Sequence, residues 1–207
     1  MERERIVLAI AKGRIMKDSL AALNKGGISV SSIKEDSREL VFDLDGYRIL
    51  SCKPADVPKY VELGTADIGI VGSDCISESG CEIYEPMSLS FGKCKMVVAA
   101  MRKNKINLKP GEEIKVATKY PNITRKYFSK KKLIPNIIYL NGSVELAPIV
   151  GLSDVIVDIT ETGETIKKND LKIIDTIMNI SAKVIVNKTS LKVKKDLIND
   201  FLKIFKK

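Results

Sequence analysis

The sequence predicts an α/β fold of two lobes with mixed, largely parallel sheets. Short β-branched apolar runs alternate with helix-like segments along all 207 residues. Loops that carry glycine or hydroxyl groups follow several of these runs, which is where open α/β sheets bind ligands. A long connection at residues 89–93 and a return near residue 180 predict lobe I over residues 1–91 and 180–207 and lobe II over residues 92–179. We expect the active site in the cleft between the lobes.

The composition defines the class of protein. An apolar fraction of 44% and a charged fraction of 29% are typical of soluble globular proteins. The apolar runs fall far short of the ~20 residues that a membrane-spanning helix needs, so we expect a cytoplasmic protein. The four cysteines show no C-x-x-C spacing, and the chain contains no histidine. A zinc site or a histidine-based triad is therefore nearly excluded.

The net charge of +9 raises the question of a nucleic-acid partner. Aromatic residues make up only 5% of the chain and tryptophan is absent, which argues against surfaces that stack bases. Most of the lysines are scattered along the chain instead of clustered. A polyanionic small molecule explains the charge equally well, and we expect no nucleic acid among the partners.

The first predicted strand covers residues 6–11 and runs into Lys12, Gly13 and Arg14, which begin a helix. Two cations around a glycine at the carboxyl end of a strand suit phosphate binding. The alternative is a basic turn on the surface that joins the strand to its helix.

The next elements are structural. Residues 40–44 and 47–52 alternate apolar with polar side chains around an Asp-Gly pair, which predicts a β-hairpin. A short helix starts after Lys53 and stops at a glycine, and residues 66–72 form a buried strand that ends before Asp74. Gly72 is the last residue of this predicted strand.

Three further strands are predicted at residues 96–101, 114–117 and 137–140. Thr118 and Lys119 follow the second of them, and Asn122 or Thr124 is expected to cap the basic helix that comes next. Together with Arg125 and the N–H groups of that helix, they would make a second anion site; the alternative is a capped surface helix. A helix over residues 144–150 carries Glu145 near its start.

The chain is organised around residues 155–166. An apolar strand leads to the carboxylates Asp158 and Glu161, and the turn Thr162-Gly163-Glu164-Thr165 opens a helix. Glycine lets the backbone approach a ligand, and successive N–H groups form an anion cradle. The carboxylates are placed to receive the vicinal hydroxyls of a ribose or to hold a divalent cation. The stretch predicts a ribose-5-phosphate site; the alternative is that the acids cap the helix and Gly163 serves a plain turn.

The last part of the chain returns to the first lobe. Residues 173–180 and 183–186 are predicted as extended, and residues 191–205 as one amphipathic helix. Basic amphipathic helices can bind membranes. We favour packing against the core, because the faces of an α/β sheet need to be covered, and we expect no membrane partner. The apolar face of this helix comprises Leu197, Ile198, Phe201, Leu202 and Phe205.

Five motifs in order resemble those of ATP phosphoribosyltransferase, the first enzyme of histidine biosynthesis. They are residues 8–14, 56–62 with 67–74, 117–124, 142–148 and 158–165. The resemblance runs from about residue 6 to the last residue. It implies a fold like that of periplasmic binding proteins, Mg²⁺ bound through substrate phosphates, and condensation of ATP with 5-phosphoribosyl 1-pyrophosphate. A non-catalytic solute-binding or effector-sensing domain is the alternative with the same fold.

The resemblance also implies roles for individual residues. Asp158 and Glu161 would be catalytic and, with Thr162, Gly163, Glu164 and Thr165, would bind phosphoribosyl pyrophosphate. The residues facing ATP or pyrophosphate would be Lys12, Gly13, Arg14, Lys53, Asp74, Thr118, Lys119 and Glu145. Two positions depart from the family pattern: Lys53 stands where arginine is common, and Glu164 stands where a small residue is common. Lysine keeps the charge but loses the bidentate fork of arginine.

The resemblance is to the short form of the family, because the sequence ends with the last amphipathic helix. Short-form members work with a regulatory subunit that resembles histidyl-tRNA synthetase, in a hetero-octamer. We therefore expect a homodimer or a mixture of oligomers for the isolated chain, with little activity and no response to histidine.

Overall fold

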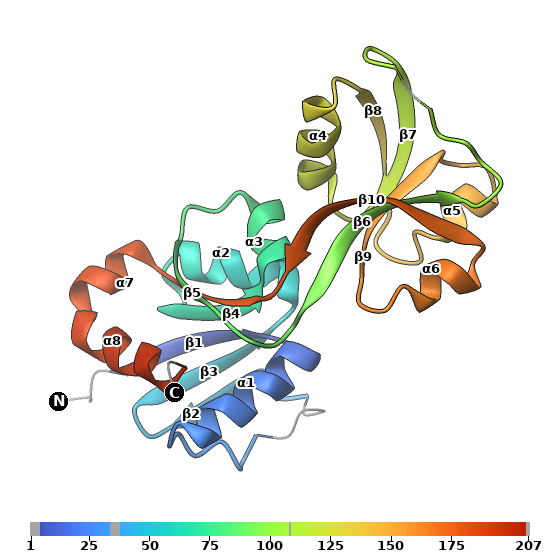
Figure 1. Cartoon of the computed structure of the whole chain (residues 1–207). Coiled ribbons are helices and arrows are strands. Elements are labelled where there is room, and N and C mark those ends of the chain that lie inside the picture. Colours follow the sequence, from blue (N-terminus) through green and yellow to red (C-terminus); the bar gives the residue numbers. More distant parts are fainter. Residues whose placement is uncertain (1–4, 34–37, 108, 206–207) are drawn as a thin grey trace. The chain divides into compact units, whose positions relative to one another are not determined.

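The computed structural model describes residues 5–33, 38–107 and 109–205. The chain forms two compact units (Figure 1). Unit 1 comprises Met1–Gly92 and Ser181–Lys207, and unit 2 comprises Lys93–Ile180. Each unit is built on one mixed sheet covered by helices, as expected for an α/β protein. Within the described ranges, no helix is both long and apolar enough to cross a membrane.

The sheet of unit 1 has the strand order β2-β3-β1-β4-β11-β5. The central strand β1 runs parallel to β3 and β4, and the remaining neighbours are antiparallel. The carboxyl ends of β3, β1 and β4 therefore lie side by side at one edge. The strands are β1 (Ile6–Ala11), β2 (Val41–Leu44), β3 (Tyr47–Cys52), β4 (Ile68–Gly72), β5 (Tyr84–Ser88) and β11 (Ala182–Val186).

Helices cover both faces of this sheet. Leu8 and Ile10 of β1 belong to the apolar cluster that includes Phe201, whereas the alternate residues Ala9 and Ala11 pack in the cluster of Val57. A strand buried on both faces explains the continuous apolar run of β1. The helices are α1 (Arg14–Lys25), the 3₁₀ turn η1 (Pro54–Asp56), α2 (Val57–Glu62), α3 (Ser73–Ser79), α7 (Lys188–Val193) and α8 (Lys195–Ile204).

The sheet of unit 2 has the strand order β10-β6-β9-β7-β8. Strand β7 runs parallel to β8 and β9, while β6 is antiparallel to β9 and β10. The elements are β6 (Cys94–Met101), β7 (Glu113–Thr118), α4 (Pro121–Lys130), β8 (Ile134–Tyr139), α5 (Leu146–Ile149), β9 (Val155–Thr160), α6 (Glu164–Lys168) and β10 (Leu171–Ile180).

Strand β9 separates two apolar clusters of unit 2. Val155 and Val157 pack with residues of α4, whereas Ile156 packs with Ile166 of α6 and Ala147 of α5. Because side chains alternate along a strand, Asp158 and Thr160 continue on the side of Ile156. The two polar residues at the strand end thus face the same side as α5 and α6.

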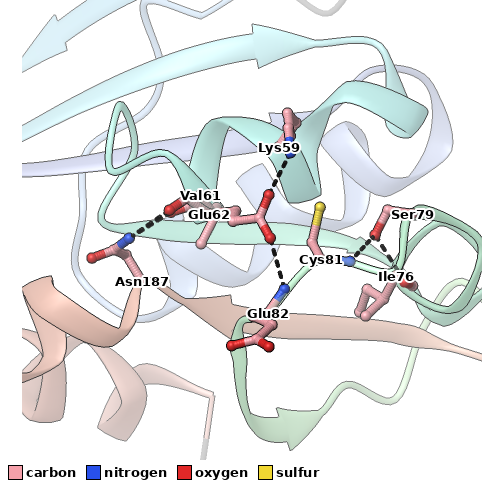
Figure 2. Close-up of polar contacts among 8 residues, drawn as sticks. All are labelled: Lys59, Val61, Glu62, Ile76, Ser79, Cys81, Glu82 and Asn187. Carbon is pink, nitrogen blue, oxygen red and sulfur yellow. Dashed lines mark hydrogen bonds and ion pairs between the residues drawn. The ribbon is translucent and has the colours of Figure 1, made fainter.

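A buried asparagine joins the C-terminal segment of unit 1 to the N-terminal part of the same unit. The Oδ1 atom of Asn187 accepts hydrogen bonds from the N–H groups of Thr189 and Ser190, at 2.9 and 2.8 Å, and so caps α7. Its Nδ2 donates to the Val61 carbonyl at 2.8 Å, at the end of α2 (Figure 2). One side chain therefore satisfies backbone groups at two helix ends.

Figure 2 also shows the Glu62 carboxylate between Lys59 and the backbone N–H of Glu82. These bonds, with that of Lys59 first, lower the pKa of Glu62 to about 2. The segment that follows α3 is thereby joined to the end of α2.

The prediction of a single C-terminal helix over residues 191–205 is wrong. The structure has α7 and α8, which meet at Lys194. The Nζ atom of Lys194 donates to the buried carboxylate of Asp67 and to the Arg5 carbonyl, at 2.9 Å in each case. The predicted apolar face is confirmed for Ile198, Phe201 and Leu202, which are buried, while Leu197 is 38% exposed.

Two other expectations need correction. Tyr120 is the N-cap residue of α4, so Asn122 and Thr124 lie inside that helix and neither caps it. Helix α3 and strand β5 were not predicted from the sequence. Both are short, and β5 is an edge strand with a proline, a combination with little apolar periodicity.

Candidate functional site

A cavity of about 200 Å³ lies in unit 2 at the end of β9. Polar side chains dominate its wall, and three isoleucines form the apolar part. The lining residues are Glu145, Ile156, Asp158, Ile159, Thr160, Glu161, Thr162, Glu164, Thr165 and Ile166. The cavity therefore contains the carboxylates and the hydroxyl-bearing turn that the sequence singled out.

Asp158 is the half-buried carboxylate of this cavity. Burial raises its pKa to about 6; the hydrogen bond from the Ile159 N–H opposes this, the negative charge of Glu145 adds to it, and the positive charge of Lys119 opposes it. The Ile159 N–H donates to Oδ1 at 2.8 Å. A partly desolvated carboxylate in this position is suited to accept hydrogen bonds from sugar hydroxyls.

The turn after β9 is shaped by one glycine and two hydroxyl groups. Gly163 has φ +79°, a left-handed conformation that strains any other residue. Its N–H donates to Oγ1 of Thr160 at 3.0 Å, and the Glu164 N–H donates to Oγ1 of Thr162 at 3.3 Å. The side chains of Thr162 and Thr165 are exposed, so hydroxyl groups are presented to the cavity.

Lys119 and Glu145 lie close enough to Asp158 for their charges to act on its pKa. The topology explains this grouping, because Lys119 follows β7 and Glu145 comes after β8, while Asp158 is on β9. These three strands are neighbours and parallel, so residues after their carboxyl ends gather at one edge. The charges of Lys119 and Glu145 therefore both act on Asp158 at this edge.

Thr118, which was predicted to face an anion, lies in the interior of unit 2. It is fully buried, its Oγ1 donates to the Val157 carbonyl at 2.8 Å, and the same atom accepts from the Tyr120 N–H at 2.9 Å. The hydroxyl thus joins the ends of β7 and β9 and shapes the turn that carries Lys119.

The remaining predicted site residues belong to unit 1, at the carboxyl ends of β1, β3 and β4. Lys12, Arg14 and Lys53 are exposed, and the Lys12 N–H donates to the Cys52 carbonyl at 2.8 Å. Gly13 has φ +84°, which suits a glycine between strand and helix. The structure thus places three cations on neighbouring loops of one sheet edge.

Asp74, in the first turn of α3, is 6% exposed. A Cβ atom at Gly72 would collide with its Oδ1 atom, so the glycine that ends β4 leaves room for this carboxylate.

Nearby, burial raises the pKa of Cys52 to about 11, with a further contribution from Asp56 and an opposing one from Lys12. The thiol is therefore protonated at neutral pH and belongs to the apolar cluster under the loop.

Thr160 was not among the site residues predicted from the sequence. This residue lines the cavity, and its hydroxyl accepts the hydrogen bond from Gly163. The spacing of a hydroxyl three residues before a turn glycine is the signal that was available, because serine and threonine side chains bond to nearby backbone N–H groups in turns.

The comparisons with known proteins agree with one another. The family model described as HisG, ATP phosphoribosyltransferase, matches residues 53–207. An ATP phosphoribosyltransferase of Clostridioides difficile (strain 630) is 48% identical over 202 residues, which is 97% of this chain and 96% of the relative.

Solved structures indicate the same family. The chain is similar to one in the ATP phosphoribosyl transferase (HisG:HisZ) complex from Thermotoga maritima, with a TM-score of 0.85, 38% identity, and coverage of 97% of this chain and 96% of that one. The alkanesulfonate-binding protein SsuA from Xanthomonas axonopodis has a TM-score of 0.60 at 10% identity, covering 99% of this chain and 73% of SsuA. At that identity the likeness concerns the fold alone, which is the periplasmic-binding-protein-like fold.

Proposed function

The chain belongs to the ATP phosphoribosyltransferase family, and from this premise we propose how its residues carry out the reaction. The chain condenses ATP with 5-phosphoribosyl 1-pyrophosphate to N1-(5-phosphoribosyl)-ATP and pyrophosphate, the first step of L-histidine biosynthesis. It is a pentosyltransferase. The observation that carries the proposed roles is the cavity at the end of β9, where carboxylates and a hydroxyl-bearing turn line one space.

In the proposed mechanism, N1 of adenine attacks the anomeric carbon of the ribose. Its lone pair forms the new C–N bond, while the electrons of the breaking C–O bond leave with pyrophosphate, and the configuration at the anomeric carbon inverts. Adenine N1 is already a nucleophile, so the protein needs no strong base. Its contribution is positioning and electrostatic stabilisation of an oxocarbenium-like state.

We assign the phosphoribosyl group to the cavity of unit 2. Asp158 and Glu161 would hold the ribose hydroxyls and favour positive charge on the sugar ring. The turn Thr162-Gly163-Glu164-Thr165 would bind the 5-phosphate through hydroxyl and N–H groups. The exposure of the Thr162 and Thr165 side chains supports this assignment.

We assign the triphosphate and pyrophosphate to cationic loops. The ammonium groups of Lys12 and Lys53 would attract phosphate oxygens as point charges, and the guanidinium of Arg14 would donate two hydrogen bonds to them. The turn at Gly13 would lie beside these groups. In unit 2, Lys119 would likewise attract phosphate oxygens and Glu145 would face the nucleotide. For Thr118 the buried hydroxyl supports a role in shaping the Lys119 turn, and for Asp74 the burial supports a role within its loop.

We propose Mg²⁺ as the metal of the reaction. In the part of the chain that the structure describes, no three Cys, Asp or Glu side chains form a group that holds a metal alone. Asp158 and Glu161 line the cavity and offer the oxygen ligands that Mg²⁺ prefers, and substrate phosphates would supply others. The ion would neutralise charge on the leaving pyrophosphate.

We propose that the chain works with a regulatory subunit, in the place that HisZ takes in the HisG:HisZ complex of its Thermotoga maritima relative. We propose a hetero-octamer and a cytoplasmic location for this assembly. A homodimer of the isolated chain remains a further proposal.

The test of the assigned roles is pyrophosphate release by the chain together with its regulatory subunit, in the presence of both substrates and Mg²⁺. Asp158→Asn and Thr162→Ala are each expected to lower kcat/KM at least about tenfold, the effect of losing one charge-assisted or transition-state contact. Circular dichroism should show that both variants stay folded. Wild-type rates in both variants would place the site elsewhere, and ligand binding without any turnover would favour a solute-binding domain.

A further inference from the structure

We propose that Thr160 is a positioning residue for phosphoribosyl transfer, because its hydroxyl holds Gly163 in the conformation in which the turn faces the cavity. The inference rests on the proposed function, which assigns this cavity to the ribose phosphate. Thr160 is the last residue of β9 and lines the cavity, and the resemblance to the family implies no role for its side chain.

A hydrogen bond joins the end of strand β9 to the turn that follows it. Oγ1 of Thr160 accepts a hydrogen bond of 3.0 Å from the N–H of Gly163, the N-cap residue of α6. Thr160 is itself held by its pairing with Lys95 in the sheet. The hydrogen bond therefore holds the turn at Gly163 in a fixed position relative to the end of the strand.

The glycine needs this support. Gly163 adopts φ +79° and is buried, with no atom within 4 Å of the position that a Cβ would take. Glycine loses more conformational freedom on folding than any other residue, so nothing but its backbone contacts keeps it in place. A buried N–H without an acceptor is costly, so removing the hydroxyl should make the turn rearrange.

Thr162 in the same turn has a different task. Its Oγ1 accepts from the Glu164 N–H at 3.3 Å, which is longer than the bond at Thr160, and its side chain is exposed. A long hydrogen bond at an exposed hydroxyl is easily exchanged for one to a ligand. We therefore assign ligand contact to Thr162 and positioning to the half-buried Thr160.

The decisive variants are Thr160→Val and Thr160→Ser, in the complex with the regulatory subunit. Valine keeps the β-branched shape and the strand preference but has no acceptor, whereas serine keeps the hydroxyl. Thr176→Val is the matched control, because Thr176 is an exposed threonine of β10 that does not line the cavity.

Thr160→Val is expected to raise KM for phosphoribosyl pyrophosphate about fivefold while kcat stays within twofold, the pattern of lost uniform binding. KM for ATP should not change. Thr160→Ser and Thr176→Val should keep wild-type values within about twofold. In addition, the amide hydrogen of Gly163, followed by NMR, should exchange about tenfold faster in Thr160→Val.

Two results would overturn the inference: unchanged KM and Gly163 exchange in Thr160→Val, or equal effects of the valine and serine variants. Failure of the proposed function looks different. In that case the wild-type complex releases no pyrophosphate, while amide exchange at Gly163 still reports on the hydrogen bond to Thr160.

Discussion

At the scale of single residues, Asp158 links the stability of the chain to its activity. Its pKa of about 6 in the folded state lies above the ordinary value of 3.8. The folded state therefore holds the proton at a pH where the unfolded state has lost it. The stabilising contribution is complete below pH ~4 and is lost as the pH rises through ~6, by up to about 3 kcal/mol.

We predict that Asp158→Asn removes this dependence. In urea titrations the free energy of unfolding of the wild type should fall relative to that of the variant as the pH rises from 4 to 7. An equal pH response of both proteins would show that Asp158 does not titrate in this range. Because the ionised carboxylate accepts the sugar hydroxyls, kcat/KM of the wild type should rise up to about pH 6 and then level off.

Local spacing in the sequence predicts which candidate residues share the cavity, but it does not predict the environment of Thr118. Asp158, Glu161 and Thr162 come from one local stretch, so spacing alone brings them to the same cavity. Thr118 was expected to meet an anion, but its hydroxyl donates to Val157, which is 39 residues away in the chain. That bond depends on the register of β7 against β9, and no local pattern specifies it.

At the scale of elements, Asn187 joins two helix ends and is 8% exposed. We predict that Asn187→Ala lowers the free energy of unfolding by about 2–4 kcal/mol, because it removes the cap of α7 and the hydrogen bonds that Nδ2 donates to the Val61 and Glu62 carbonyls. Chemical denaturation measures the loss. Asn179→Ala, at an exposed asparagine of β10, is the control and should change stability by less than about 0.5 kcal/mol.

Asn187→Asp separates the two contributions of this side chain. A carboxylate still caps α7 but cannot donate to the Val61 carbonyl. We therefore expect a loss at least as large as that of Asn187→Ala. A nearly neutral Asn187→Asp would mean that capping of α7 accounts for the whole effect.

Elements with a strong apolar period were predictable, and those defined by long-range contacts were not. The bounds of β1 and the hairpin of β2 and β3 follow from local patterns. The break between α7 and α8 does not, because the apolar period continues across it. The two helices meet at Lys194, whose Nζ atom donates to Asp67, a residue 127 positions earlier in the chain.

At the scale of the whole molecule, the positive charge is concentrated in one unit. Unit 2, Lys93–Ile180, contains 16 Lys and Arg against 9 Asp and Glu, a net +7 out of the total of +9. Unit 1 has 19 against 17 and is nearly neutral. Most of the excess positive charge therefore lies in the unit to which we assign the phosphoribosyl group. A positive electrostatic field attracts a polyanionic substrate.

The charge distribution bears on association with substrate. We predict that kcat/KM for phosphoribosyl pyrophosphate falls steeply when the ionic strength rises from 0.05 to 0.5 M. At ~0.1 M, salt already screens the interaction between surface charges that are more than about 10 Å apart. Stability to urea should change little over the same range. An activity independent of salt would show that local contacts alone, without the field of unit 2, determine capture.

Assembly is the last property at this scale. The Thermotoga maritima relative was solved with HisZ, and the chain covers 96% of that relative. We predict that the isolated chain has little or no activity, and that adding the regulatory subunit restores pyrophosphate release at least about tenfold, as expected when one protein biases another toward its competent state by 1.4 kcal/mol or more. The comparison needs one assay with and without the partner, at equal concentrations of this chain.

Histidine provides the second half of this test. If feedback belongs to the regulatory subunit, calorimetric titration of the isolated chain with histidine should give no heat of binding, and any residual turnover should be insensitive to it. The reconstituted complex should bind histidine and lose activity, because coupling between two sites acts in both directions. Full activity with tight histidine inhibition in the isolated chain would place the regulatory site within these 207 residues and remove the need for a partner.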